Sequence, residues 1–333
     1  MTTTADPVLD AETDPQTPDP QAPDPQGPDT DFLASVVGSL STPQKSIESK
    51  FFYDAQGSQL FDAITGLDEY YLTRAETALL RARSEEIAAL LGSGVSLVEF
   101  GSGSSVKTRI LLEALPALKV YVPIDISGAH LDAAAKRIAA DFGLPVIPLH
   151  ADYNSRVSLP LQVPRDKLVG FFPGSTIGNF EPEAAVAFLK RVHGLLGSGA
   201  RLLVGADLQK EAARLVAAYD DALGVTAAFN LNLLVRINRE LGGDFDIDAF
   251  THRALYNAEE GRIEMHLVSL KDQSVRLGGK KIHFASGETI HTENSYKYNL
   301  DSFRALAERG GWRSEAVWTD PEGLFSCHAL IAA

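Results

Sequence analysis

Two glycines and a carboxylate come together at residues 97–105, where an apolar run gives way to a helical pattern. The run ends near Glu99, Gly101 and Gly103 follow, and helical spacing of apolar residues begins at Val106. Glycine lets a backbone approach a ligand closely, and the first turn of a helix offers free N–H groups to an anion. The stretch predicts a strand, a tight turn and a helix that bind a cofactor carrying a carboxylate or a phosphate.

Two classes of cofactor use such a corner, and residue types separate them. A dinucleotide site has a third glycine at the position of Val106. An acid two residues before the first glycine, as Glu99 is here, instead resembles the S-adenosylmethionine loop of Rossmann-like methyltransferases. A generic turn between a strand and a helix also uses two glycines, so the motif alone leaves the cofactor open.

Acids also stand at the ends of the next two predicted strands. Asp125 closes one strand, and Asp152 closes the next with Tyr153 beside it. Ligands of doubly wound sheets bind at the carboxyl ends of the strands. We expect Asp125 to accept hydrogen bonds from ribose hydroxyls and Asp152 to accept one from an adenine amino group, while Tyr153 packs on the ring. Together with Glu99, these acids favour a binding site for an adenosine-bearing cofactor over the interpretation that each acid is merely a turn residue at a strand end.

Lys107 lies in the first turn of the helix that follows the glycine loop. One interpretation is a solvated surface lysine. The other is a partner for the methionine carboxylate of the cofactor, since this turn borders the predicted anion site. Spacing alone leaves both interpretations open.

The predicted elements around these residues alternate between strand and helix. Near-continuous apolar strands of this kind indicate a buried parallel sheet with helices on its faces. The predicted strands are residues 95–100, 119–126, 144–153, 167–175 and 200–208. Predicted helices are residues 106–115, 130–142 and 182–196, the last with Pro182 in its first turn.

This alternation stops after Leu208 and resumes near the C-terminus. The intervening elements are a long helical region at 210–241 and strand-like runs at 262–270 and 274–284. A helix at 301–311 and strands at 315–320 and 325–332 complete the pattern, and we expect these two strands to close the sheet as an antiparallel pair.

The chain from residue 32 to about residue 92 shows helical patterns. Thr73, with Glu76 three residues later, predicts a capping box at the start of the last of these helices. The neighbouring side chains of Tyr70 and Tyr71 point in different directions, so we expect one in the core and one free for a site.

The fold predicted from this order is α/β. Its sheet is Rossmann-like with an inserted α+β subdomain, and the resemblance implies an S-adenosylmethionine-dependent methyltransferase sheet whose insert is a substrate-binding subdomain. The predicted regions are a disordered, acidic, Pro-rich tail at 1–31, an N-terminal helical region at 32–92 that packs with the substrate subdomain, the methyltransferase domain at 93–208 and 297–333, and the inserted subdomain at 209–296.

Composition excludes several classes of protein. The net charge is −14, and eight acids without a Lys or Arg lie in residues 1–31. The mildly acidic remainder argues against a nucleic-acid partner, which requires a basic footprint. A single cysteine, Cys327, allows no internal disulfide and agrees with a reducing compartment. The N-terminus is not typical of a signal peptide, and no apolar run reaches the length of a membrane span, so we expect a cytoplasmic protein without a membrane partner. We also expect a monomer.

The histidines show no metal-ligand spacing with the cysteine or with clustered acids, so we predict no metal. Those considered are His130, His150, His252, His266, His283 and His291.

Longer stretches resemble the histidine Nα-methyltransferase family of ergothioneine biosynthesis. They are STPQKSIESKFFYDAQGSQLFDAIT, EYYLTRAE, LVEFGSGSSVKTR, PGSTIGNF, RLVAAYDDALGVTAAFN and TENS, and the resemblance runs from about residue 41 to the C-terminus. The first two stretches and the one around Tyr219 are not general methyltransferase features. The resemblance implies three successive methylations of the α-amine of L-histidine to the betaine hercynine, with S-adenosylmethionine as cofactor.

The resemblance also implies roles for individual residues. Gly101, Lys107, Asp125, Asp152 and Tyr153 would bind S-adenosylmethionine, and Tyr153 stands where the family usually has Phe. Tyr70, Gly174, Asn179 and Tyr219 would hold the backbone atoms of histidine, while Glu293 and Ser295 would hold its imidazole. Tyr53 and Met265 match positions near the substrate.

Other interpretations remain for these residues. Asn179 suits a zwitterion because it offers a donor and an acceptor, but it could instead cap the next helix. Tyr219, in a predicted helix, could be a core residue. Glu293 and Ser295 alternate on a predicted strand and therefore share a face, which could be solvated.

The expected reaction is direct displacement of the sulfonium methyl by a neutral amine, with Tyr70 and Asn179 as the catalytic residues. We expect no strong dedicated base. Substrates would be histidine and its mono- and dimethyl forms. The alternatives are a related N-methyltransferase acting on another amino acid, such as a tryptophan derivative, an NAD-dependent oxidoreductase, and a binding protein with a degenerate cofactor site.

Overall fold

The computed structural model describes residues 30–103, 106–126 and 128–333, and for residues 129 and 130 only the backbone. The predicted tail at 1–31 lies outside the described residues except for Thr30 and Asp31, which begin the first helix. Two residues of the glycine loop, 104 and 105, also lie outside them.

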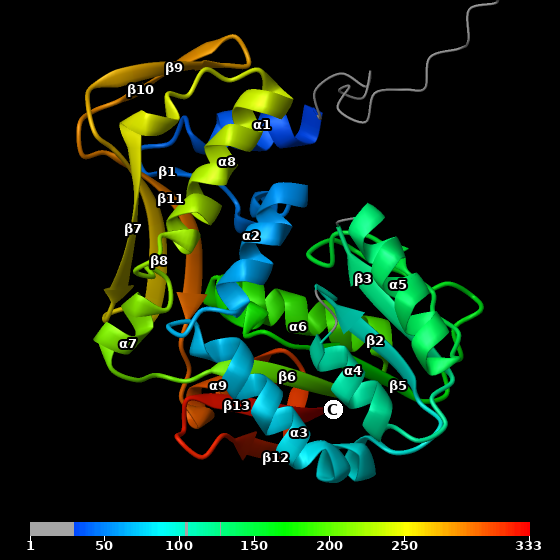
Figure 1. Ribbon diagram of the computed structural model, residues 1–333. Coiled ribbons are helices and arrows are strands. Elements are labelled where there is room, and N and C mark those ends of the chain that lie inside the picture. Colours follow the sequence, from blue (N-terminus) through cyan, green and yellow to red (C-terminus); the bar gives the residue numbers. More distant parts are fainter. Residues whose placement is uncertain (1–29, 104–105, 127) are drawn as a thin grey trace, which may run out of the picture.

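A seven-stranded sheet forms the larger part of the molecule, with the order β12-β13-β6-β5-β2-β3-β4 (Figure 1). Five neighbouring strands are parallel, whereas β13 is antiparallel to both β6 and β12. This order confirms the predicted Rossmann-like α/β fold and its antiparallel closing pair. The strands are β2 (Ser96–Phe100), β3 (Val120–Asp125), β4 (Leu149–His150), β5 (Leu168–Phe172), β6 (Arg201–Asp207), β12 (Trp312–Thr319) and β13 (Phe325–Ala332).

Helices cover both faces of this sheet, because its strands are apolar on both faces. Along β2, for example, Leu97 packs in one core and Val98 in another. The helices on the Leu97 side are α3 (Tyr71–Leu91), α4 (Val106–Ala114) and α5 (Gly128–Phe142), and those on the Val98 side are α6 (Pro182–Leu196) and α9 (Leu300–Arg309). As predicted, Pro182 is the first residue of its helix.

A second sheet has the order β1-β11-β8-β7 and stands beside the first. Its strands are β1 (Lys45–Ser46), β7 (Phe250–Asn257), β8 (Arg262–Ser269) and β11 (Thr289–Tyr296), with a separate hairpin of β9 (Gln273–Leu277) and β10 (Lys280–Phe284). Figure 1 shows α2 (Ala55–Thr65) and α8 (Val225–Leu241) on the side that faces the larger sheet. Together with α1 (Thr30–Ser39), they share one apolar core with this sheet.

Several local predictions were wrong. The helical region predicted at 210–241 is broken into α7 (Ala212–Ala217) and α8, and Tyr219 lies in the break. The run at 274–284 is a hairpin because Gly278 and Gly279, both with positive φ, turn the chain. The strand predicted at 144–153 is reduced to β4 and an isolated bridge at Val146.

The predicted capping box at Thr73 is also wrong. Helix α3 begins at Tyr71, so Thr73 lies inside it, and Glu76 is buried and bound elsewhere. The predicted domain boundaries stay a prediction. Among the described residues, none of the helices is both long enough and apolar enough to cross a membrane.

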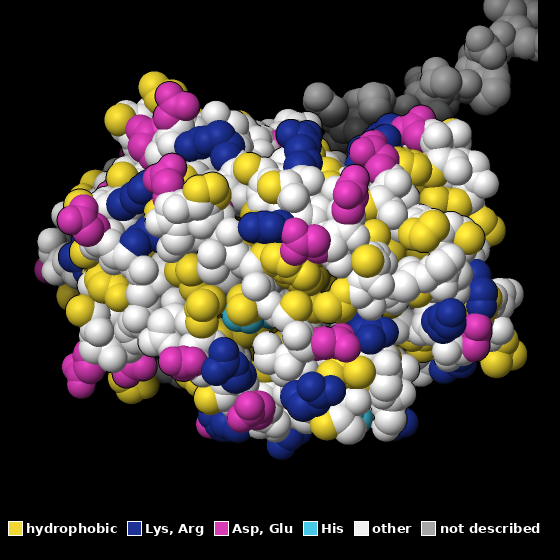
Figure 2. Space-filling model, turned by 90° about the horizontal axis from the view of Figure 1, so that it is seen from below, with side chains coloured by type: hydrophobic (Ala, Val, Ile, Leu, Met, Phe, Trp, Pro, Cys, Tyr) yellow, Lys and Arg dark blue, Asp and Glu magenta, His cyan; other side chains and the backbone are white. Residues whose placement is uncertain are grey.

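Figure 2 shows one face of the molecule, on which Lys and Arg side chains alternate with Asp and Glu. Opposite charges lie close together across this face, and no large basic patch gathers on it. The face therefore lacks the footprint that a nucleic-acid partner would need.

The two sheets meet at a short helical turn, η2 (Thr176–Asn179), which packs against β11. A Cβ added to Gly178 would lie 2.6 Å from the backbone oxygen and 3.2 Å from the backbone nitrogen of Tyr296. Neither backbone atom can move aside without shifting β11. The absence of a side chain at Gly178 is therefore what permits this close contact.

We expect Gly178→Ala to lower the free energy of unfolding by about 1–3 kcal/mol, because the new methyl group forces η2 and β11 apart. Denaturant unfolding measures the change. Gly194→Ala is the matched control, since Gly194 is exposed in helix α6 with nothing within 4 Å of an added Cβ. Its expected change is stabilising and below about 1 kcal/mol. Equal effects of the two variants would contradict the close-contact interpretation.

Candidate active site

Two connected cavities lie between the sheets. A large cleft holds about 2670 Å³ of empty space, and a smaller pocket holds about 540 Å³. The pocket opens from the cleft, because both are lined by the same group of residues, which are Tyr53, Phe61, Tyr70, Gly174, Thr176, Asn179 and Glu293. A molecule in the cleft would therefore be in contact with one in the pocket.

The cleft contains every residue that the sequence predicted for the cofactor. They are Glu99, Gly101, Gly103, Lys107, Asp125, Asp152 and Tyr153. Gly101 and Gly103 have φ values of +76° and +42°, which side chains rarely allow. A Cβ at Gly101 would also lie only 3.5 Å from the ring of Tyr153. Glycine is thus needed at these two positions for the backbone conformation, whereas the distance to Tyr153 is an ordinary van der Waals contact.

Glu99 lies at the base of the cleft and is 1% exposed. Its carboxyl group accepts hydrogen bonds from Thr108 Oγ1 at 2.8 and 2.9 Å and from the hydroxyl of Tyr121. Burial raises its pKa to about 8, although these two hydrogen bonds oppose the shift. Glu99 therefore joins β2, β3 and α4 beneath the glycine loop. Direct contact with a cofactor stays a prediction.

Lys107 is not a solvated surface lysine. Its Nζ lies 2.5 Å from Oε2 of Glu76, which is 1% exposed. The same carboxylate accepts the backbone N–H of Gly174 at 2.9 Å. A Cβ on Gly205 would lie 2.1 Å from Glu76 Oε1, so the glycine leaves room for it. Glu76, which the sequence assigned to a cap, connects the cofactor side of the cleft with the substrate pocket.

The far side of the cleft carries the other two predicted acids. Asp152 Oδ1 accepts the backbone N–H of Asn154 at 2.7 Å, and Asp152 Oδ2 lies 4.0 Å from Lys50 Nζ. The ring of Tyr153 packs edge-on against Phe172. Asp125 closes β3 as predicted and lines the cleft. Both acids therefore stand at the carboxyl edge of the parallel strands.

The smaller pocket contains every residue predicted for the substrate. They are Tyr53, Tyr70, Gly174, Asn179, Tyr219, Met265, Glu293 and Ser295. Tyr70 packs edge-on against Tyr219 and against Phe61. Phe229, which was not predicted, packs beside Tyr53 and also lines the pocket. The roles of these residues remain predictions, but their common location is a property of the fold.

Asn179 ends the η2 turn and lines both cavities. It does not cap the next helix, whose N-cap is Glu181 without a side-chain cap hydrogen bond. Just before the turn, Gly174 and Ser175 both have positive φ, at +82° and +56°. This bend places the backbone of Gly174 and Ser175 between Glu76 and the pocket.

Carboxyl and hydroxyl groups gather at the inner end of the pocket. Glu293 and Ser295 both line it, as their alternation on β11 predicted. Ser295 Oγ lies 2.7 Å from the Tyr219 hydroxyl, so Tyr219 is not merely a core residue. Burial raises the pKa of Glu293 to about 7, against the charge of Lys297, which lowers it.

Sequence reasoning missed the charged groups behind this end of the pocket. Asp207 is fully buried and pairs with Lys297 Nζ at 2.9 Å and with Lys210 Nζ at 2.7 Å. It also accepts the hydroxyl hydrogen of Tyr71 at 2.7 Å. One signal was available, since Asp207 is a further acid at the end of a predicted strand. Nothing in the sequence indicated that Lys297 would be its partner.

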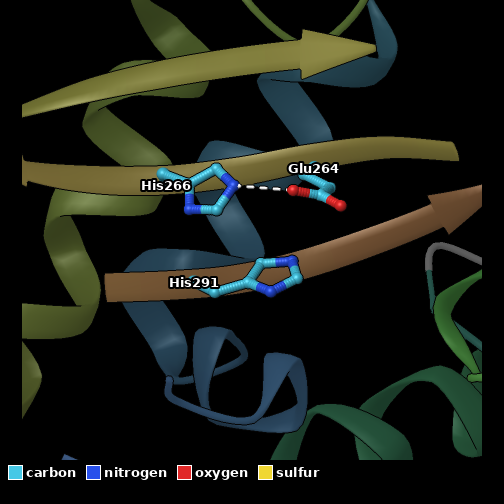
Figure 3. Close-up of side chains that lie close together, drawn as sticks. All are labelled: Glu264, His266 and His291. Atoms are coloured by element: carbon cyan, nitrogen blue, oxygen red, sulfur yellow. Dashed lines mark hydrogen bonds and ion pairs between the residues drawn. The ribbon is translucent and has the colours of Figure 1, made fainter. Parts of the chain in front are cut away.

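A cluster of Glu264, His266 and His291 lies on the second sheet (Figure 3). The two histidines are far apart along the chain and meet only through the pairing of β8 with β11, so their spacing in the sequence does not indicate the cluster. His266 Nε2 bonds Glu264 Oε2 at 3.0 Å, and the two imidazole rings stack with centroids 4.7 Å apart. The guanidinium Nε of Arg262 donates to Glu264 Oε1 at 2.8 Å. Arg262 also pairs with Glu181 at 2.9 Å, so two carboxylates share its charge, and the predicted absence of a metal stays a prediction.

Comparison with known proteins identifies a family and several relatives. Residues 32–332 match the family described as histidine-specific methyltransferase, SAM-dependent. The histidine N-alpha-methyltransferase of Mycolicibacterium smegmatis is 44% identical over 302 residues, covering 89% of this chain and 93% of the relative. Ergothioneine biosynthesis protein 1 of Neurospora crassa is 30% identical, covering 83% of this chain and 32% of that protein. A 4-dimethylallyltryptophan N-methyltransferase of Arthroderma benhamiae is 28% identical, covering 85% and 87%.

We expect Glu76→Ala to lower the free energy of unfolding by about 3–5 kcal/mol, because Lys107 and the Gly174 N–H would lose a buried carboxylate. Chemical denaturation measures this change. Glu85→Ala on the same helix is the control, since Glu85 is exposed, and we expect a change within about 0.5 kcal/mol. A loss at Glu76 no greater than that at Glu85 would show that the carboxylate does not stabilise the fold.

Proposed function

Because this chain belongs to the histidine-specific, S-adenosylmethionine-dependent methyltransferase family, we propose that it methylates the α-amine of L-histidine. Three transfers would give hercynine, the first product on the route to ergothioneine. The observation that carries this proposal is the pocket itself, which joins the cofactor cleft and ends in Glu293 and Ser295. Mono- and dimethyl histidine would be the intermediate substrates.

The cleft suits S-adenosylmethionine in shape and in charge. Gly101 and Gly103 have positive φ and no side chain. This part of the cleft wall is therefore bare backbone that a ligand can approach closely. Asp125 would accept from the ribose hydroxyls, Asp152 from the adenine amino group, and Lys107 would face the methionine carboxylate. When bound, S-adenosylmethionine supplies a methyl group already activated by its sulfonium charge.

The shared wall of the two cavities would orient the amine. Tyr70 and Asn179 line both cavities, so they would hold the backbone end of histidine next to the cofactor. Burial raises the pKa of Tyr70 well above its usual value, so its hydroxyl stays protonated and cannot act as a strong base. The amine must therefore lose its proton to solvent or through this hydroxyl and water, and positioning supplies the main catalytic effect.

The inner end of the pocket would select the ring. An ionised Glu293 accepts one hydrogen bond, and the hydroxyls of Ser295 and Tyr219 can supply another, which suits the two nitrogens of imidazole. An indole offers a single N–H donor and would leave these polar groups unpaired, at a high energetic cost. A tryptophan derivative, the substrate named for one relative, is therefore the weaker candidate.

The function is tested by mass spectrometry of the purified protein with S-adenosylmethionine and each amino acid in turn. We expect trimethylated histidine as the sole amino-acid product, because a neutral imidazole ring offers one N–H donor to Glu293 and one acceptor nitrogen to the hydroxyl pair of Ser295 and Tyr219. Methylation of a different amino acid would retain the fold and the cofactor but overturn the substrate assignment. No methylated product from folded protein would overturn the proposed function.

Glu293→Ala should lower kcat/KM for histidine by roughly 10²–10⁴-fold, because it leaves a ring nitrogen unpaired in a buried pocket. Calorimetric titration should show cofactor binding unchanged in this variant. Asp125→Ala should give the opposite pattern, with weaker binding of the cofactor and unchanged recognition of the imidazole ring by Glu293 and Ser295. Unchanged activity of Glu293→Ala would remove this residue from the substrate pocket, and unchanged cofactor binding of Asp125→Ala would remove that residue from the cofactor site.

A further inference from the structure

Lys297 is a buried cation directly behind the ring subsite, which is the inner end of the pocket formed by Glu293, Ser295 and Tyr219. Its side chain is 0% exposed, and its Nζ lies 2.9 Å from Asp207 Oδ2. It also donates to Ser295 Oγ at 2.7 Å and to the Tyr219 hydroxyl at 3.0 Å. An ammonium group has three N–H donors, so these three acceptors saturate it. Lys297 therefore holds both hydroxyl groups as acceptors of its own hydrogen atoms.

The hydroxyl hydrogens can then be counted. Ser295 Oγ and the Tyr219 hydroxyl lie 2.7 Å apart, so one donates to the other. That bond uses one of their two hydrogens. The remaining hydrogen has no acceptor among the groups just named, and both residues line the pocket. The pair therefore presents a hydrogen-bond donor to the pocket, and Lys297 is what prevents it from acting only as an acceptor.

The opposite polarity comes from Glu293, whose carboxylate is an acceptor when ionised. A neutral imidazole has one N–H donor and one acceptor nitrogen, so it can satisfy both sides of the pocket. An imidazolium has two N–H donors and no acceptor, so one of its N–H groups would face the hydroxyl donor. The positive charge of the imidazolium would also be separated from the ammonium group of Lys297 by only one hydroxyl group.

The other charged groups around this subsite offset the charge of Lys297 only in part. Asp207 divides its carboxylate between Lys297 and Lys210. His252, behind the Tyr219 carbonyl, has its pKa lowered by burial, which disfavours its charged form. The titratable groups that line the subsite or lie in the network behind it are Glu293 on β11, Lys297 after it, Asp207 at the end of β6, Lys210 after it, Tyr70 and Tyr71 at the start of α3, Tyr53 before α2, Tyr219 after α7, and His252 on β7.

We propose that Lys297 makes this subsite specific for an uncharged azole ring and excludes the protonated imidazolium. The inference rests on the proposed function and adds the protonation state of the substrate that the site accepts. Lys297 touches no substrate atom in this account. It is a positioning residue that acts through Ser295 and Tyr219.

The test measures binding of hercynine to the whole protein in the presence of S-adenosylhomocysteine. Hercynine has a quaternary amine, so its ring is the only ligand group that titrates between pH 5.5 and 7.5. At pH 5.5 the free ring, with a pKa near 6.5, and free Glu293, with a pKa of about 7, are both mostly protonated. Both protons must leave when the neutral ring binds. The wild-type Kd should therefore rise by about 100-fold from pH 7.5 to pH 5.5.

Lys297→Met removes the charge, so the complex can keep one proton shared between Glu293 and the ring. Its Kd should rise by only about tenfold over the same range. Asp207 keeps Lys210 and Tyr71 as partners in this variant. Ser295→Ala is the matched control, because it removes the hydroxyl but leaves the charge. We expect it to weaken binding at every pH and to keep the steep wild-type slope.

The outcomes separate this inference from the proposed function. If wild-type protein makes no hercynine and does not bind it, the proposed function fails and this inference with it. If binding occurs but Lys297→Met keeps the wild-type slope, Lys297 is merely structural and only this inference is overturned. Should that variant not fold, proton release on wild-type binding at pH 6.0 decides. Release of about 1.7 protons supports the inference, and release of about 0.7, which means that the complex keeps one proton, overturns it.

Discussion

The structure depends on the burial of one carboxylate, Asp207, at the end of β6. A fully buried charge is costly unless it is paired and hydrogen-bonded. Its partners come from three separate segments, with Tyr71 at the start of α3, Lys210 after the strand, and Lys297 after β11. Asp207 thereby fastens the second sheet to the carboxyl edge of the first, and this is the edge where the pocket forms.

A second buried acid, Glu76, does the same for the cofactor side. It pairs with Lys107 at the start of α4 and accepts the N–H of Gly174 at the bend before η2. Glu76 and Tyr71 both belong to α3, so one helix supports the cofactor cleft and the substrate pocket together. The cleft and the pocket share lining residues, so contacts of this one helix bear on both.

The two cavities have different roles because different kinds of residues line them. Glycine backbone and acids at strand ends line the cleft, whereas tyrosines and a buried charge network line the pocket. A transferred methyl group needs no acid–base machinery of its own, since the sulfonium is already reactive. The protein instead has to orient a neutral amine and recognise a polar ring, and both tasks require hydrogen-bonding groups fixed in position before the substrate arrives.

The sequence by itself determined the parallel sheet, the glycine loop and the acids at strand ends. These features are local, because the carboxyl ends of parallel strands meet at one edge whatever else the chain does. It also supplied the family resemblance, and with it the eight predicted substrate residues, all of which line the pocket. It assigned Glu76 to a cap and gave no partner to Lys297, because the neighbours of a buried charge lie far away along the chain. Only the packing of the second sheet against the first decided those pairs, since burial requires a partner and the sequence order does not say which segment provides it.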